Sequence, residues 1–280
     1  MRFFDRLSNG WKLGMTSLRI IRENMSLLFF PIFSSLALIL VTMSFFGGFV
    51  LFFGVDLEGW LDESSGGSQI IVYAGLFAFY LVNYFLIVFF NVGLVHCARL
   101  IFEGKEARIG DGLRYSASRT DAILSWAVLA ATVGVVLQVV EDRLGWIGQL
   151  VAGIVGVVWS IATFFVVPVL AYENVGPVEA LKRSGRIMKE KWGEAIGANF
   201  SFGLFFILGY LVIIGVAILL FQVHPLLGIV PAVLSALLLH TVVAAAKSVF
   251  IAATYNHLSN QPAGQFDEHG MLDRLFVPKK

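Results

Sequence analysis

The chain has 280 residues, of which 58% are hydrophobic and only 14% charged. A soluble domain is about half apolar and about a quarter charged, so this composition excludes an ordinary soluble globular protein and indicates an integral membrane protein. The formal net charge of +1 argues against a nucleic-acid partner, and the single cysteine, Cys97, excludes an intrachain disulfide.

Residues 1–26 predict a cytoplasmic amphipathic helix. One apolar face at spacings of three and four residues is formed by Phe3, Leu7, Trp11, Gly14, Leu18 and Ile21. The basic residues off this face are Arg2, Arg6, Arg19 and Arg22. A helix of this kind lies in the plane of the lipid headgroups. The apolar stretch behind it lacks a cleavage pattern, so we expect it to remain as the first membrane span.

Six later segments are apolar and long enough to cross a bilayer, which takes about 20 residues. They are residues 27–53, 70–97, 122–140, 146–171, 195–221 and 226–253. None contains an acidic residue, and the only basic one is Lys247. The sequence therefore predicts an all-α polytopic bundle of six transmembrane helices over residues 27–255. A cytoplasmic C-terminal tail, residues 256–280, follows it.

The connections between these spans alternate in charge. Lys and Arg are frequent in the N-terminal segment, from Arg99 to Arg119, and from Lys182 to Lys191. Residues 54–69 contain acidic but no basic side chains, and residues 222–225 contain neither. Because Lys and Arg are retained in the cytoplasm, we expect both termini there.

The basic segments also predict a repeated plan, because each precedes a pair of spans. Pro177 is placed as a first-turn proline. Behind it, Val178, Leu181, Met188 and Trp192 form an apolar side, and Lys182, Arg186 and Lys189 a basic one. Leu113-Arg114-Tyr115-Ser116 resembles Leu181-Lys182-Arg183-Ser184. We expect three two-helix units, each preceded by a cytoplasmic amphipathic interfacial helix. The basic faces either fix topology or recognise anionic lipid headgroups, at about 1 kcal/mol per side chain.

One stretch of the chain is similar to a known family. It contains Val167-Pro168-Val169-Leu170, then Glu173-Asn174-Val175-Gly176-Pro177 and the helix behind it, and Lys191-Trp192-Gly193-Glu194. This pattern resembles an uncharacterised family of six-span prokaryotic integral membrane proteins, a domain of unknown function. The resemblance extends to Asp111-Gly112-Leu113 and to the tail around Phe276-Val277-Pro278-Lys279. It implies a prokaryotic cytoplasmic membrane, and it brings no activity and no site residues.

Small residues at steps of four predict two helix-packing faces, because they let helix backbones approach closely. The fourth span has Gly148, Ala152, Gly156 and Ser160. The sixth has Ala232, Ala236, Ala244, Ser248 and Ala252.

Polar groups inside the predicted spans are candidate functional residues, since lipid makes them costly. The candidates for lining a cavity are His240, Asn83, Asn91 and Asn199, and the candidate charges at the inner interface are Lys247 and Glu173. The alternative is structural: the polar groups tie helices together at about 1 kcal/mol each, and Lys247 reaches the headgroups. Pro168 is expected to kink the fourth span.

The sequence lacks the short motifs of soluble enzymes, and its five histidines form no recognisable metal set. We therefore expect no enzymatic activity, no catalytic or metal site and no cofactor. The predicted function is a small pathway or binding cavity for a lipid, an ion or a small amphiphile. The alternative is a membrane scaffold or an accessory subunit of a larger or homo-oligomeric complex. The expected partners are membrane lipids, and in the second case a membrane protein or another copy.

Overall fold

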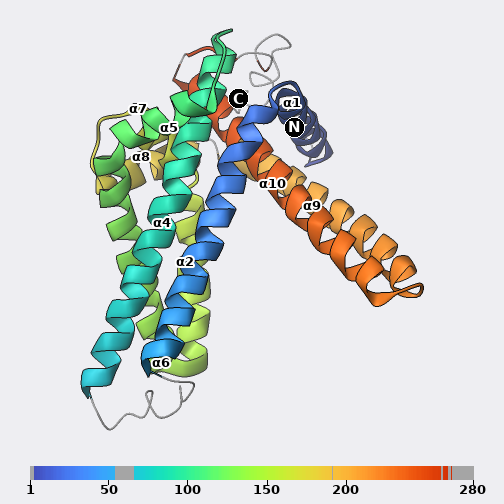
Figure 1. Ribbon diagram of the computed structural model, residues 1–280. Coiled ribbons are helices and arrows are strands. Elements are labelled where there is room, and N and C mark those ends of the chain that lie inside the picture. The colour runs from blue at the N-terminus through green and yellow to red at the C-terminus, as the bar shows by residue number, and fades with distance from the viewer. Residues whose placement is uncertain (1–2, 54–65, 191, 260, 264–265, 267–280) are drawn as a thin grey trace. The chain divides into compact units, whose positions relative to one another are not determined.

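The computed structural model describes residues 3–53, 66–190, 192–259, 261–263 and 266, and within these residues it is all-α with no strand (Figure 1). The side chains of residues 3–10, 49, 52–53, 66–69, 190 and 192–202 are also outside the description. Most of the predicted connection 54–69 and of the predicted tail 256–280 falls outside it too.

The helices follow one another in this order: α1 (Phe3–Glu23), the 3-10 turn η1 (Met25–Leu28), α2 (Phe29–Phe53), α4 (Gly66–Phe102), α5 (Ile109–Ser118), α6 (Thr120–Ala162), α7 (Val166–Tyr172), α8 (Pro177–Glu190), α9 (Trp192–Phe221) and α10 (Pro225–Leu258). Among the residues that the structure describes, five stretches are long and apolar enough to cross a membrane: Met25–Gly48, Ile70–Phe102, Thr120–Ala162, Gly203–Phe221 and Pro225–Leu258. Helices suit that environment because every backbone group within them is satisfied internally. Pro177 opens α8, as its sequence position predicts.

Helix α6 is 43 residues long and contains the third and most of the fourth predicted span. Its backbone is non-helical at Gly145, where φ is 54° and ψ is −130°. A straight helix would hold Trp126 and Trp159 about 50 Å apart at 1.5 Å per residue. Instead their rings stack with centroids 5.7 Å apart. The chain therefore folds back at Gly145, and the two arms of α6 lie side by side.

The fourth predicted span is interrupted near its end. Helix α6 stops at Ala162 and α7 begins at Val166, whereas the sequence favours one continuous helix kinked at Pro168. The backbone N–H of Phe165 donates to the Ser184 hydroxyl at 2.9 Å across the break. Pro168 lies in the first turn of α7, where a missing N–H costs no helical hydrogen bond. The break therefore precedes the proline, and a distant side chain stabilises it.

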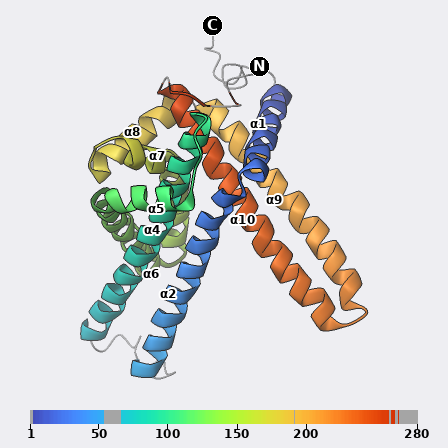
Figure 2. The same ribbon diagram turned by 45° about the horizontal axis from the view of Figure 1, so that its top comes forward.

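The chain divides into two compact units, each described here by itself. The first unit comprises residues 1–32, 93–113 and 186–280, and the second comprises residues 33–92 and 114–185. In the first unit, α1 packs on α9 and α10 (Figure 2). The Trp11 ring stacks on Phe205 at 4.2 Å, next to Gly14, where an added Cβ would lie 2.7 Å from the Phe205 ring. Among the described side chains of α1, the buried large apolar ones are Leu13, Ile20 and Ile21. Of the predicted stripe, Gly14 and Ile21 are buried, Leu18 is intermediate and Trp11 is 36% exposed.

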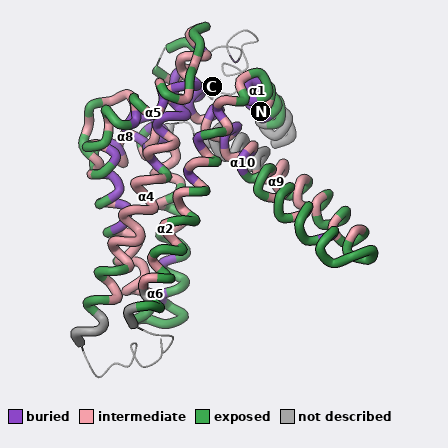
Figure 3. The backbone as a smooth tube through the Cα atoms, in the orientation of Figure 1, coloured by how far each residue is buried: buried purple, intermediate pink, exposed green. Residues whose placement is uncertain are grey.

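The first unit has two contrasting ends. Its packed end, residues 13–30, 93–112 and 241–256, contains fully buried small and apolar side chains such as Ala245, Ala246 and Val249 (Figure 3). Its outer hairpin, residues 207–238 of α9 and α10, exposes large apolar side chains such as Leu211, Leu234 and Leu238. Large apolar side chains face lipid without penalty, so this exposure suits a membrane environment.

The turn after α4 is closed by a Schellman motif. The N–H of Lys105 donates to the Leu100 carbonyl, and that of Gly104 to the Ile101 carbonyl. Gly104 has φ 72°, the left-handed conformation that this motif requires and glycine adopts without steric cost. The motif ends the long helix α4 and directs the chain into α5.

Candidate functional site

The helices that precede the spans each bury one serine completely. Ser17 of α1, Ser116 of α5 and Ser184 of α8 are all 0% exposed. The Ser17 hydroxyl donates to the Leu13 carbonyl at 3.0 Å, and that of Ser116 donates to the Phe89 carbonyl of α4 at 2.7 Å. Ser184 accepts from the Phe165 N–H. The serine of α5 thus fixes that helix to the interior of α4, and the serine of α8 fixes its helix to the break between α6 and α7.

The residue four positions before each serine is buried as well. Leu13 is 1% exposed, Gly112 is buried and Ala180 is 0% exposed. Residues four apart lie on one face of a helix, so each helix has a buried face with a serine on it. Ser116 and Ser184 stand within the matching tetrapeptides of the sequence, but the burial of the three serines was not predicted from it. The sequence signal that could have predicted this burial is a small polar residue inside an otherwise apolar helix face.

The opposite faces of α1 and α8 are basic and exposed. They carry Lys12, Arg19 and Arg22 in α1, and Lys182, Arg186 and Lys189 in α8. Among the residues that the structure describes, none of these six forms an ion pair. Cations that have no acidic partner of their own remain able to bind an anion.

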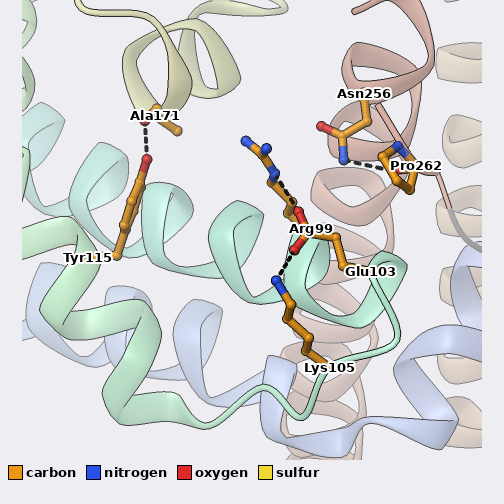
Figure 4. A network of polar contacts seen from close by, with 7 residues as sticks. All are labelled: Arg99, Glu103, Lys105, Tyr115, Ala171, Asn256 and Pro262. Carbon is orange, nitrogen blue, oxygen red and sulfur yellow. Dashed lines mark hydrogen bonds and ion pairs between the residues drawn. The ribbon is translucent and has the colours of Figure 1, made fainter. Parts of the chain in front are cut away.

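The C-terminal end of α7 is held by two other helices of the second unit. The Tyr115 hydroxyl of α5 donates to the carbonyl of Ala171 (Figure 4). Glu173, predicted as an inner-interface charge, forms an ion pair with Arg183 of α8, Nε to Oε1 at 3.2 Å. This carboxylate therefore neutralises a cation of α8 next to the exposed basic face.

A second charged group lies at the end of α4 (Figure 4). The Glu103 carboxylate is 3.0 Å from Arg99 Nε and 2.6 Å from Lys105 Nζ. The hydrogen bond from Lys105, supported by Arg99, lowers the pKa of Glu103 below its ordinary value, against the opposing effect of partial burial. Because its cations are satisfied within the group, this cluster stabilises the helix end and is less suited to binding an anion.

The candidate cavity residues make local contacts. The side-chain amide of Asn83 donates to the Phe79 carbonyl at 2.7 Å, and that of Asn91 donates to the Ile87 carbonyl at 2.8 Å. His240 is exposed, with its ring 5.8 Å from that of Phe206. Asn83 and Asn91 belong to the second unit and His240 to the first, so neither unit by itself brings the three together.

The two remaining predicted site residues are Asn199 on α9 and Lys247 on α10. The Asn199 side chain lies outside the described residues, and Lys247 is half-buried on α10.

Of the first predicted packing face, Gly148 and Ala152 are buried, Gly156 is intermediate and Ser160 is exposed. A Cβ on Gly148 would lie 2.3 Å from the Val140 carbonyl oxygen, so this glycine permits the fold-back of α6.

The second predicted packing face is also only partly closed. Ala236, Ala244 and Ser248 have intermediate exposure. Ala252 of this face is 0% exposed, and so are the neighbouring positions Ala245 and Val249. The buried positions of α10 therefore include one residue of the predicted face together with residues of the adjacent face.

Within the described part of the chain, no group of three or more His, Cys, Asp or Glu residues is arranged to hold a metal ion. The polar features that recur in these helices are a buried serine in α1, α5 and α8 and an exposed basic face on α1 and α8. The basic faces are the candidate functional surfaces.

Comparison with known proteins gives a family but no activity. None of the curated proteins matches the sequence. The model of a family of unknown function, DUF6159, matches residues 70–271, which include most of α4 and the helices from α5 to α10. Since this match covers most of the chain, the protein belongs to that uncharacterised family, DUF6159.

Proposed function

We propose that the protein is a non-enzymatic, six-span membrane protein that binds an anionic lipid at the basic faces of its cytoplasmic helices. Six crossings follow if each arm of α6 crosses once, because the chain reverses at Gly145. The distribution of Lys and Arg supports a cytoplasmic location for α1, α5, α8 and both termini. The family resemblance implies that the membrane is that of a prokaryotic cell. In this proposal the sequence contains three repeats, each an amphipathic interfacial helix followed by two spans; these repeats are not the two compact units of the fold.

The observation that carries this proposal is the exposed basic face of α1 and α8. Each helix buries its apolar side and its serine against the protein, which fixes the direction of the opposite side. Each Lys or Arg near an anionic membrane surface contributes about 1 kcal/mol of attraction. A fixed row of such side chains favours headgroups that carry a phosphate charge.

Among the candidate ligands, we favour a lipid over an ion. Asn83 and Asn91 each donate a side-chain N–H to a carbonyl of their own helix, which is a structural use of these amides. A lipid or similar amphiphile requires only an apolar surface beside a cationic one.

The test is the lipid that accompanies the purified protein. The full chain is extracted in a mild detergent, and the bound phospholipids are quantified by mass spectrometry against the bulk membrane. We expect anionic phospholipids to be enriched over zwitterionic ones. A bound fraction with the same composition as the bulk membrane would contradict the proposal.

A second candidate function is a scaffold or accessory subunit, in which the outer hairpin would contact a partner in place of lipid. Side chains such as Leu211, Val212 and Leu238 are 61%, 67% and 61% exposed, which leaves a broad apolar surface for another membrane protein or another copy. Light scattering of the detergent-extracted protein tests this role. A stable assembly supports it, and a monodisperse single chain counts against it.

A further inference from the structure

Helices α1 and α8 share a short sequence motif. Residues 17–23 read Ser-Leu-Arg-Ile-Ile-Arg-Glu, and residues 184–190 read Ser-Gly-Arg-Ile-Met-Lys-Glu. The serine, the first arginine, the first isoleucine and the glutamate are identical, and the fifth and sixth positions are chemically alike. The two segments are aligned without a gap.

The structure places the matching apolar positions in matching surroundings. Ser17 and Ser184 are each 0% exposed. Ile20 and Ile21 are 2% and 3% exposed, and their counterparts Ile187 and Met188 are 8% and 3% exposed. Packing against the rest of the protein accounts for the identity of these positions, because a buried face tolerates little change in volume.

Packing does not account for the matching basic positions. Arg19 and Arg22 are exposed in α1, as are Arg186 and Lys189 in α8. Among the described residues, none of the four has an acidic ion-pair partner. Some other requirement therefore keeps a cation at the third and sixth positions of both segments.

Membrane topology alone does not set that requirement, because the positive-inside rule depends on the number of cations and not on their register. Other exposed positions of the two helices differ in charge when aligned by the motif. Lys12 corresponds to Glu179, and Met15 corresponds to Lys182. The two copies thus agree in charge at the motif cations and disagree beside them.

We propose that each motif binds one phosphate group of an anionic phospholipid, through Arg19 with Arg22 in α1 and through Arg186 with Lys189 in α8. Residues three apart lie on the same side of a helix, so each pair is able to hold one anion. The arginine guanidinium matches a phosphate with two parallel hydrogen bonds, and the second cation supplies charge. This inference rests on the proposed function and assigns its headgroup sites.

The experiment is a titration of the full-length protein in detergent with phosphatidylglycerol, followed by native mass spectrometry. The variant pair Arg19→Gln with Arg186→Gln removes the motif arginines. The matched control, Arg108→Gln with Arg143→Gln, removes the same charge from exposed positions outside the basic faces of α1 and α8. A third pair, Arg19→Lys with Arg186→Lys, retains the charge but loses the planar donor fork.

Loss of charge-assisted hydrogen bonds is expected to weaken phosphatidylglycerol binding about tenfold in the Arg→Gln pair. The Arg→Lys pair should show a smaller loss, and the control with Arg108→Gln and Arg143→Gln should remain within about twofold of the wild type, since long-range attraction alone is weak. An equal loss in the control would overturn the inference, because only net charge would then matter. Unchanged binding in the Arg→Gln pair would also overturn it.

Two further arms separate the sources of failure. If the wild type binds phosphatidylcholine as tightly as phosphatidylglycerol, the proposed function itself fails. If inorganic phosphate binds with the same dependence on Arg19 and Arg186 as the lipid does, the sites recognise free phosphate and the assignment to a lipid is overturned. A thermal melt of each variant must match the wild type, and because the substituted side chains are exposed, we expect that it does.

Discussion

The two halves of α10 are both apolar, yet they have opposite surroundings. In the half nearer its C-terminus, Ala245, Ala246 and Ala253 are each 0% exposed. In the half nearer its N-terminus, Leu226 and Leu234 are 63% and 62% exposed. Within a membrane, large apolar side chains gain little by leaving lipid, whereas small ones let helices approach closely. Side-chain size therefore separates contact from lipid-facing surface better than hydropathy does.

The largest effect that would test this contrast is expected at Gly112, in the packed end. An added Cβ there would lie 2.5 Å from Phe30 Cζ and 2.7 Å from the Gly93 carbonyl oxygen. Because one of these neighbours is backbone, Gly112→Ala should cost about 2–3 kcal/mol through overpacking. The measurement is the thermal melting midpoint of the detergent-purified protein.

The matched change is Gly215→Ala in the outer hairpin, where nothing lies within 4 Å of an added Cβ. Alanine is favoured over glycine in a helix by about 1 kcal/mol, so this variant should melt at the same temperature or slightly higher. Equal destabilisation by the two variants would remove the distinction between the packed end and the outer hairpin.

An intermediate effect is expected from Ser184→Ala in α8, which extends the comparison of buried and exposed positions to a short helix outside the long spans. The change leaves the Phe165 N–H without its partner in a buried position, at a cost of about 1–3 kcal/mol. The control is Ser118→Ala, whose hydroxyl is exposed and bonds only the nearby Tyr115 carbonyl. Melting midpoints should fall for the first and hardly change for the second; the reverse order would show that the break after α6 does not depend on this hydrogen bond.

The smallest effect is a pH dependence at Glu103. Its pKa is lowered in the folded protein from an ordinary value of 4.5, chiefly by the hydrogen bond from Lys105. The ion pairs with Lys105 and Arg99 therefore contribute fully above that ordinary value, and the contribution is lost as pH falls through the lower folded pKa. For ion pairs at the protein surface, this contribution to the free energy of unfolding is about 0.5 kcal/mol.

Glu103→Gln should accordingly lower the melting midpoint slightly at neutral pH and converge with the wild type in acid. Added salt should reduce the difference, because it screens exposed charges. A difference that is independent of both pH and salt would assign the effect to packing at the end of α4.

Several elements were predictable from local sequence signals. Pro177 marks the start of α8, and long apolar runs mark the helices that are able to span a membrane. The reversal near residue 145 was expected as a short connection, but not that one glycine with positive φ would make it. These features depend on propensity and length, which a single sequence displays.

The features that were not predictable depend on contacts between distant residues. The helix break at residues 163–165 involves Ser184, and the buried face of α1 depends on Phe205. Asn83 and Asn91 were recognisable as costly polar groups, but their partners were not, because a hydrogen bond to the chain's own helix leaves no trace in spacing. The motif shared by residues 17–23 and 184–190 was visible in the letters alone and became meaningful once burial separated its structural positions from its exposed ones.

The reversal at Gly145 also affects whether a protease is able to cleave the chain at the turn between the two arms of α6. Arg143 is exposed, but residues 141–144 are helical and so are residues 146–149. A protease binds its substrate as an extended strand, and helical backbone on both sides of a one-residue bend does not offer one. Trypsin should therefore leave this turn intact in the folded protein, and cleavage at Arg143 would report local unwinding of the α6 arms.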